Sequence, residues 1–244
     1  MPYRFIKHLI ALAAFGLSST WVHSDTVRVA VANMQPPYFI EASGTGLDID
    51  IVSEALTTMG HQITLIPVKS SEMDDVLTTG VADIVIPQTA SSHADGAVLS
   101  VPYSTRNLAA FALSERRLPI NSAADLSTYR VVSFDGASRF VGASFQSVSN
   151  NNTYYSETPR HHSLVDRLFS ERADVIVMDK YTFDFFKTNP RRVPTNRETM
   201  ELSWFEPVPV MAGFASDELR IGFDKALKTL MMTGRINSIA AAYH

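Results

Sequence analysis

The sequence of 244 residues contains no cysteine, and it contains no uncharged apolar run long enough to cross a lipid bilayer. The apolar run at residues 9–17 is far shorter than the roughly 20 residues that a transmembrane helix needs. Without cysteine the chain can form neither a disulfide nor a lipid anchor on an N-terminal cysteine. Its stability must therefore rest on a hydrophobic core, for which its length is sufficient.

An excess of basic residues is also missing. The chain has 21 Lys and Arg against 25 Asp and Glu, a formal net charge of −4. Proteins that bind nucleic acids usually gather Lys and Arg on one face, often with aromatic side chains for stacking. No such pattern is present, so a nucleic acid is not an expected partner.

Residues 1–24 have the features of a secretory signal peptide. Arg4 and Lys7 precede the apolar run, and Val22 and Ser24 are small enough for cleavage before Asp25. A buried N-terminal core helix is the alternative. Cleavage removes only these two basic residues, so the 220 that remain hold 19 basic and 25 acidic residues, a charge of −6. We expect an exported, periplasmic protein that is soluble and monomeric after cleavage.

One unit occurs twice in the sequence, 91 positions apart. Each copy has an Asp-x-Leu, four further residues, an Ala-Asp pair and a run that is apolar throughout, and the two copies span residues 75–86 and 166–178. Each predicts a short amphipathic helix and then a strand buried on both faces, as in a parallel sheet covered by helices. The short period of a solenoid is absent. The sequence therefore predicts two similar α/β lobes.

Other patterns complete the two lobes. Strands are predicted at 26–32, 63–68, 108–113, 130–134 and 208–215, and helices at 47–59, 71–80, 135–148, 179–187, 217–233 and 235–243. We expect lobe one to contain residues 25–112 and 212–244, and lobe two residues 113–211. The chain would then cross between the lobes twice, near 111–114 and 209–213, and these two crossings would form a hinge.

The ends of the two apolar runs are candidate site residues. Ligands of open α/β sheets bind beyond the carboxyl ends of the strands. Gln88 and Thr89 follow the first run and Asp179 ends the second, so we expect them to face each other across a cleft. Asp179 could instead merely cap the following helix. Asp48 and Asp50 begin a helix and are interpreted as stabilising its dipole rather than as a catalytic pair.

Five short motifs follow one another in the sequence. They are Gln-Pro-Pro-Tyr at 35–38, Gly-Leu-Asp-Ile-Asp at 46–50, Pro-Tyr at 102–103, Asp-Gly-Ala-Ser at 135–138, and the apolar strand at 173–179 that ends in Asp. In this order they resemble the type-2 periplasmic solute-binding proteins of family 3, which serve polar amino-acid ABC transporters. The resemblance runs from about residue 26 to residue 243. It implies a two-lobed α/β fold that closes around a small polar solute, and an inner-membrane ABC permease as partner.

The resemblance also implies a set of ligand-binding residues. Asp179 would bind a ligand ammonium group, and the backbone of Gly136, Ala137 and Ser138 would hold an anionic group, although this segment could be an ordinary strand-to-helix turn. Gln35 and Ser70 stand where many family members carry aromatic residues. The full expected set is Gln35, Tyr38, Ser70, Gln88, Thr89, Gly136, Ala137, Ser138, Arg139 and Asp179.

One expected arginine is missing. In the family an arginine between the positions of Thr89 and Pro102 usually clamps the ligand α-carboxylate, but this stretch contains none. Arginine suits that role because its planar guanidinium can bind a carboxylate through two parallel hydrogen bonds. Arg106 and Arg139 are nearby candidates to replace it. The loss argues against an ordinary α-amino acid, and we expect a small polar solute that bears an amine.

No cofactor or metal site is expected. His161 and His162 are adjacent, so they face different ways on a helix, and no other ligand cluster accompanies them. A Gly-rich phosphate loop, a nucleophile elbow and a zinc-helix motif are absent from the sequence.

Two other functions stay open at this point. The cyclohexadienyl dehydratases resemble the same family, so the chain could be a periplasmic enzyme with an acid in the cleft, and turnover of prephenate or arogenate would favour that reading. It could also be a sensor subunit that presents its ligand to a separate receptor. The leading hypothesis is a solute-binding protein for an ABC importer.

Overall fold

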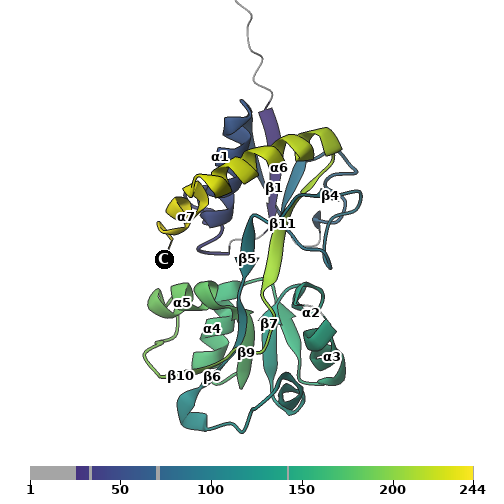
Figure 1. The fold of residues 1–244 in the computed structure, drawn as a ribbon. Coiled ribbons are helices and arrows are strands. Elements are labelled where there is room, and N and C mark those ends of the chain that lie inside the picture. The colour runs from purple at the N-terminus through teal and green to yellow at the C-terminus, as the bar shows by residue number, and fades with distance from the viewer. Residues whose placement is uncertain (1–25, 33–34, 70–71, 142, 244) are drawn as a thin grey trace, which may run out of the picture.

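The computed structural model describes residues 26–32, 35–69, 72–141 and 143–243. The chain folds into two α/β lobes, each built on its own mixed sheet, as the sequence predicted (Figure 1). The signal peptide predicted at residues 1–24 lies outside the described residues. Among those residues, none of the helices is both long and apolar enough to span a membrane.

The first sheet has the strand order β2-β1-β3-β11-β4, with β5 paired to β11. Its strands are β1 (Thr26–Ala32), β2 (Gln62–Val68), β3 (Ile84–Gln88), β4 (Val98–Leu99), β5 (Ser104–Arg106) and β11 (Val208–Phe214). Both faces of this sheet are covered. Val29 packs in the core under α1 (Leu47–Thr58) and α6 (Asp217–Met232), whereas Ala30 faces a smaller cluster around Met73 and Leu77. This burial explains why the central strand β3 is apolar at nearly every position.

The second sheet has the order β10-β6-β9-β7-β8. Its strands are β6 (Leu108–Leu113), β7 (Val131–Phe134), β8 (Ser156–Thr158), β9 (Val175–Asp179) and β10 (Thr199–Leu202). Helices α2 (Ala137–Phe140), α3 (Ala143–Asn151), α4 (His161–Phe169) and α5 (Lys180–Thr188) belong to this lobe, and α7 (Arg235–Ala240) packs with α6 on the first. Short 3-10 turns occupy Ser114–Arg116 and Ala123–Thr128.

The sequence repeat has a structural counterpart in the two lobes. Asp83 accepts hydrogen bonds from the backbone N (2.8 Å), Nε (3.1 Å) and Nη2 (2.7 Å) of Arg28. Asp174 accepts the same three bonds from Arg130, at 2.9, 3.0 and 2.7 Å. In both lobes the pair therefore joins the start of one strand to its parallel neighbour, β1 to β3 and β7 to β9. The Asp of the repeated Ala-Asp pair therefore has a structural role, because it joins two neighbouring strands through its contact with an Arg.

Three details differ from the sequence prediction. Residues 73–80 form consecutive turns rather than a regular helix, although Met73, Val76 and Leu77 are buried as expected; the Asp, Thr and Gly residues of this segment have low helix propensity. The helix predicted at 135–148 is divided into α2 and α3. Leu108–Leu113, mostly assigned to lobe one by the predicted boundary at residue 112, lies wholly in the second sheet between β10 and β9.

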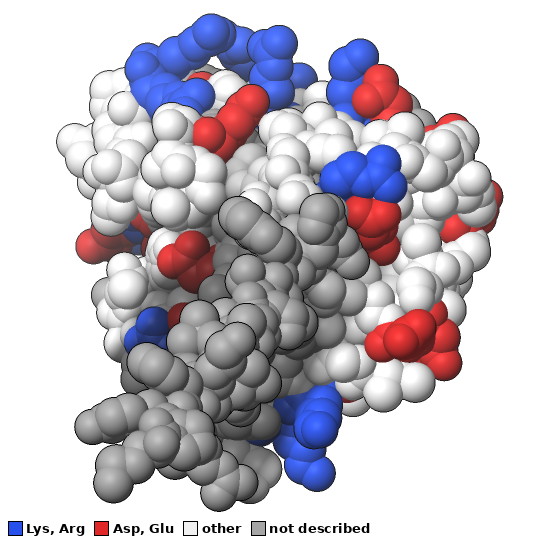
Figure 2. Space-filling view, turned by 90° about the horizontal axis from the view of Figure 1, so that it is seen from above, with Lys and Arg blue, Asp and Glu red and all other residues white. Residues whose placement is uncertain are grey.

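The lobes are connected by extended chain. β5 and β11 pair antiparallel, with Val208 opposite Arg106, and they run side by side toward the second lobe (Figure 1). Acidic and basic side chains are neighbours at several places of the face shown in Figure 2. The ion pairs of the first lobe include Arg220 with Asp217 and Asp224, and Arg235 with Glu54.

Candidate ligand-binding site

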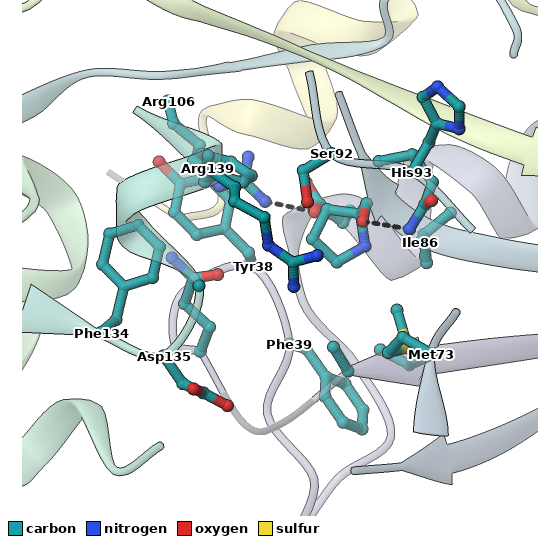
Figure 3. Close-up of a pocket in the computed structure, with 18 of the residues that line it drawn as sticks. Tyr38, Phe39, Met73, Ile86, Ser92, His93, Arg106, Phe134, Asp135 and Arg139 are labelled. Atoms are coloured by element: carbon teal, nitrogen blue, oxygen red, sulfur yellow. Dashed lines mark hydrogen bonds and ion pairs between the residues drawn. The ribbon is translucent and has the colours of Figure 1, made fainter. Parts of the chain in front are cut away.

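A cavity of about 300 Å³ lies where the two lobes meet. The first lobe lines it with residues such as Phe39, Met73 and Ile86, and the second with residues such as Phe134 and Arg139. Figure 3 shows these side chains pointing inward from both sides, with Arg139 reaching into the middle. The volume is at the small end of the range for ligand pockets, so the cavity suits a small solute.

A buried ion pair forms part of the cavity wall. Arg106, at the end of β5, is 1% exposed and pairs with Asp48, which is 3% exposed and begins α1. The guanidinium carbon of Arg106 lies 3.3 Å from the centre of the Tyr38 ring, which is a cation–π contact. Because Asp48 neutralises it, Arg106 brings no net positive charge for a ligand anion.

Tyr38 links the two lobes. Its phenol, held in the first lobe, donates a hydrogen bond of 3.0 Å to Oδ1 of Asp179 at the end of β9. A second bond between the lobes runs from Oγ of Ser91 to the backbone O of Arg139, over 3.1 Å. Phe140 of α2 packs against the cores of both lobes. The structure is therefore a closed arrangement of the lobes.

The carboxylate of Asp179 is engaged within the protein. Oδ1 also accepts the backbone N–H of Thr182 at 3.0 Å, capping α5, and Oδ2 accepts the N–H of Asn107 at 3.1 Å. The side chain is 1% exposed and is not part of the cavity wall. Burial raises the pKa of Asp179, and Arg106 together with these hydrogen bonds only partly offsets that effect.

The backbone N–H groups of the turn after β7 also have hydrogen-bond partners within the protein. The backbone N–H groups of Gly136 and Ser138 donate to the carboxylate of Glu157, over 2.7 and 3.0 Å. Gly136 adopts the left-handed conformation, with φ of +80°, which turns these N–H groups to one side. Glu157 lies on β8, and its Oε1 also accepts the phenol of Tyr155 at 2.5 Å.

Comparison with known proteins shows the family of this chain. The model of the bacterial extracellular solute-binding proteins, family 3, matches residues 27–244. The chain belongs to this family. No curated protein matches this solute-binding protein in sequence.

Solved structures with the same fold include an ancestral arginine-binding protein bound to arginine, at 21% identity and a TM-score of 0.73, covering 89% of this chain and 97% of that one. A histidine kinase sensor domain similar to periplasmic binding proteins has 19% identity and a TM-score of 0.74, with 89% and 95% covered. A putative ABC-transporter binding component from Wolinella succinogenes, complexed with lysine, has 15% identity and a TM-score of 0.71, with 89% and 95% covered. At these identities the likeness shows the fold.

The predicted ligand-binding residues divide into two groups in this solute-binding protein. Gln35, Tyr38, Gln88, Gly136 and Arg139 line the cavity. Thr89, Ala137, Ser138 and Asp179 are outside its wall, and Ser70 lies outside the described residues. Gln88 is itself occupied, since its Oε1 accepts the backbone N–H of Ala94 at 2.6 Å. Direct ligand contact by each of these residues stays a prediction.

Sequence reasoning missed several residues at the site. Asp135 and Phe134 line the cavity, and they end or follow β7, so the rule that ligands bind at carboxyl strand ends could have found them. Asp74 and His161 also line it. Glu157 carried no sequence signal, because its contact with the turn depends on the pairing of β8 with β7. Among the described residues, no three His, Asp or Glu side chains are grouped to hold a metal ion.

Proposed function

We propose that this protein is an exported solute-binding protein that captures a small, polar, amine-bearing solute between its lobes and delivers it to an inner-membrane ABC permease. The observation that carries the proposal is the position of the cavity, which takes its walls from both lobes and lies beside the hydrogen bond from Tyr38 to Asp179. A solute held there would contact both lobes at once and favour their closure.

The charge of the cavity supports an amine. Beyond the neutralised pair of Arg106 and Asp48, the charged side chains on the wall are Asp74, Asp135 and Arg139. Acidic groups therefore outnumber basic ones, which favours a cation over an anion. The structural neighbours bound to arginine and lysine support a solute of that size. Membership of a solute-binding family supports binding rather than the dehydratase activity considered above.

A thermal-shift screen of the mature chain against amino acids, amines, polyamines and small carboxylates tests the proposal. A ligand at a hundred times its dissociation constant should add about 2.7 kcal/mol to the free energy of unfolding. Small-angle scattering on the best ligand should then show a smaller radius of gyration at saturation than in its absence. A panel without any stabilising compound, or a saturated protein of unchanged radius, would contradict the proposal.

Export and delivery need separate tests. The signal-peptide pattern predicts that the secreted protein begins at Asp25. Intact-mass measurement on periplasmic protein should give the mass of residues 25–244, and a mass that includes Met1 would contradict export by cleavage. For delivery, we expect a monomer whose ligand-loaded form stimulates ATP hydrolysis by its permease, and the ligand-free form serves as the control.

A further inference from the structure

Glu157 supplies an internal anion to the turn of Gly136 and Ser138. Its two carboxylate oxygens take separate donors, Oε2 the N–H of Gly136 at 2.7 Å and Oε1 the N–H of Ser138 at 3.0 Å. A third donor, the phenol of Tyr155, also reaches Oε1. These are the donors that a carboxylate of a bound solute would need, because backbone N–H groups at such a turn favour an anion.

The position of Glu157 is fixed by the surrounding sheet. Glu157 is paired with Ser133 in the parallel ladder of β7 and β8, and the N–H of Asp135 donates to the O of Thr158 at 3.1 Å. Tyr155 packs edge-on against the buried ring of Phe145, at 5.6 Å between centres. The carboxylate therefore meets the turn from an anchored strand, and a ligand would have to break three hydrogen bonds to displace it.

No other group on the cavity wall offers a strong anion site. Residues 90–101 contain no Lys or Arg, and Arg106 is committed to Asp48. The guanidinium of Arg139 has no ion-pair or hydrogen-bond partner among the described residues, but it is exposed on a four-residue helix. An ion pair with an exposed, flexible cation is weak because water screens it and the side chain must be ordered.

We propose that Glu157 excludes a free α-carboxylate from the turn and that the solute of this protein is an amine without one, an alkylamine or guanidinoalkylamine. This inference rests on the proposed function and narrows its solute class. The turn is satisfied by the protein's own carboxylate, and Asp74 and Asp135, exposed like Arg139 but outnumbering it, leave the wall with an excess of negative charge that favours a cation. Gly136 is on the cavity wall and its N–H is already bonded to Glu157, so a solute carboxylate at this turn would find that donor taken and would meet a like charge, which lowers its affinity.

Matched ligand pairs that differ by the α-carboxylate give the sharpest test. Calorimetry on the mature chain would compare agmatine with L-arginine, and cadaverine with L-lysine. We expect at least one amine to bind at least tenfold more tightly than its parent amino acid. In Glu157→Ala the turn becomes free, so the amino acid should gain affinity and the ratio should fall by at least tenfold. Glu206→Ala, an exposed glutamate outside the cavity wall, is the control and should keep the wild-type ratio.

The possible results distinguish the exclusion of the carboxylate from the broader proposal that the protein binds an amine. If the wild type binds L-arginine or L-lysine more tightly than the amine, the exclusion of the carboxylate is wrong while the solute-binding role stands. If neither the wild type nor any variant binds any of the four compounds, amine capture is wrong and the narrower inference falls with it. If Glu157→Ala does not fold, Glu157→Gln keeps the size of the side chain and removes its charge, and an unchanged ligand ratio in Glu157→Gln overturns the inference.

Discussion

The phenol of Tyr38 and the carboxylate of Asp179 come from different lobes and meet across 3.0 Å. Around them lie the guanidinium of Arg106, stacked on the Tyr38 ring, and Asp48, which pairs with Arg106. Tyr38 therefore connects the ion pair of the first lobe to the end of β9 in the second. Because this hydrogen bond joins residues of different lobes, we expect it to favour the arrangement seen here, in which the lobes are in contact.

Tyr38→Phe should weaken ligand binding by favouring the open arrangement. The substitution removes the hydroxyl and leaves the ring beneath Arg106. A hydrogen bond to a charged group contributes about 1.5–3 kcal/mol, and about 1.4 kcal/mol is tenfold in affinity, so we expect roughly ten- to hundredfold weaker binding by calorimetry. Tyr154→Phe, on an exposed tyrosine of the second lobe, should bind as the wild type does. Equal affinity in both variants would show that the contact is incidental to closure.

Gly46→Ala should disturb the segment that carries Tyr38. Gly46 has φ of +145°, and a Cβ there would lie 2.2 Å from the backbone O of Tyr38. Gly60→Ala is a matched control, because Gly60 also has a positive φ, of +88°, but a Cβ would meet nothing within 4 Å. Overpacking costs typically ~1–3 kcal/mol, so urea unfolding should show Gly46→Ala less stable than Gly60→Ala by that amount. Equal stabilities would mean that the segment adjusts freely.

Asp174→Asn tests the contact between Arg130 and Asp174 that joins β7 to β9 in the second lobe. The Arg130 guanidinium and backbone, together with Arg116, hold the pKa of Asp174 well below its usual range despite partial burial. The folded state thus prefers the ionised carboxylate. Its stabilisation is complete above the ordinary Asp pKa of about 3.9 and is lost as the pH falls toward the lower folded value. We expect Asp174→Asn to lose about 1.5–3 kcal/mol near neutral pH.

The pH dependence distinguishes this effect from a general loss of packing. Thermal unfolding should show the difference between wild type and Asp174→Asn shrinking below pH 4, because the wild-type carboxyl becomes protonated as well. Asp184→Asn, on an exposed residue of α5, should match the wild type throughout. A difference that stays constant from pH 7 to pH 3 would contradict the ionic account.

The fold could be predicted from the sequence because its central strands are buried on both faces. The runs Ile84–Gln88 and Val175–Asp179 are almost wholly apolar and recur with the same Ala-Asp before them, so the two-lobed plan could be predicted. The lobe to which Leu108–Leu113 belongs could not be predicted, because an apolar run indicates that a strand is buried but not which strands lie beside it. Residues 73–80 bury the predicted face without forming the predicted helix.

The site was harder to predict than the fold, because its side chains contact residues that are distant in the sequence. Asp179 was identified as a candidate, and its position at the end of β9 follows from the pattern; its contact with Tyr38, 141 residues away, does not. Glu157 reaches Gly136 across 21 residues through the pairing of two short strands. Sequence periodicity carries no information about such contacts.

Asp179 should influence an amine ligand through Tyr38. In the structure its carboxylate is absent from the cavity wall and reaches it through Tyr38. If Asp179 acts through that contact, Asp179→Asn and Tyr38→Phe should each weaken binding roughly ten- to hundredfold, and the double variant should be little worse than either. Non-additivity of this kind identifies residues that act on one interaction.

Asp135→Asn provides the comparison within the same cycle. Asp135 lies on the cavity wall and its side chain has no hydrogen bond to Tyr38 or Asp179 among the described residues. Its effect should therefore add to that of Tyr38→Phe. Calorimetry with the tightest-binding amine measures all the affinities, and melting temperatures check that each variant folds. Should the effects of Asp179→Asn and Tyr38→Phe add in full, Asp179 acts independently of Tyr38, and the account of its influence through that contact is wrong.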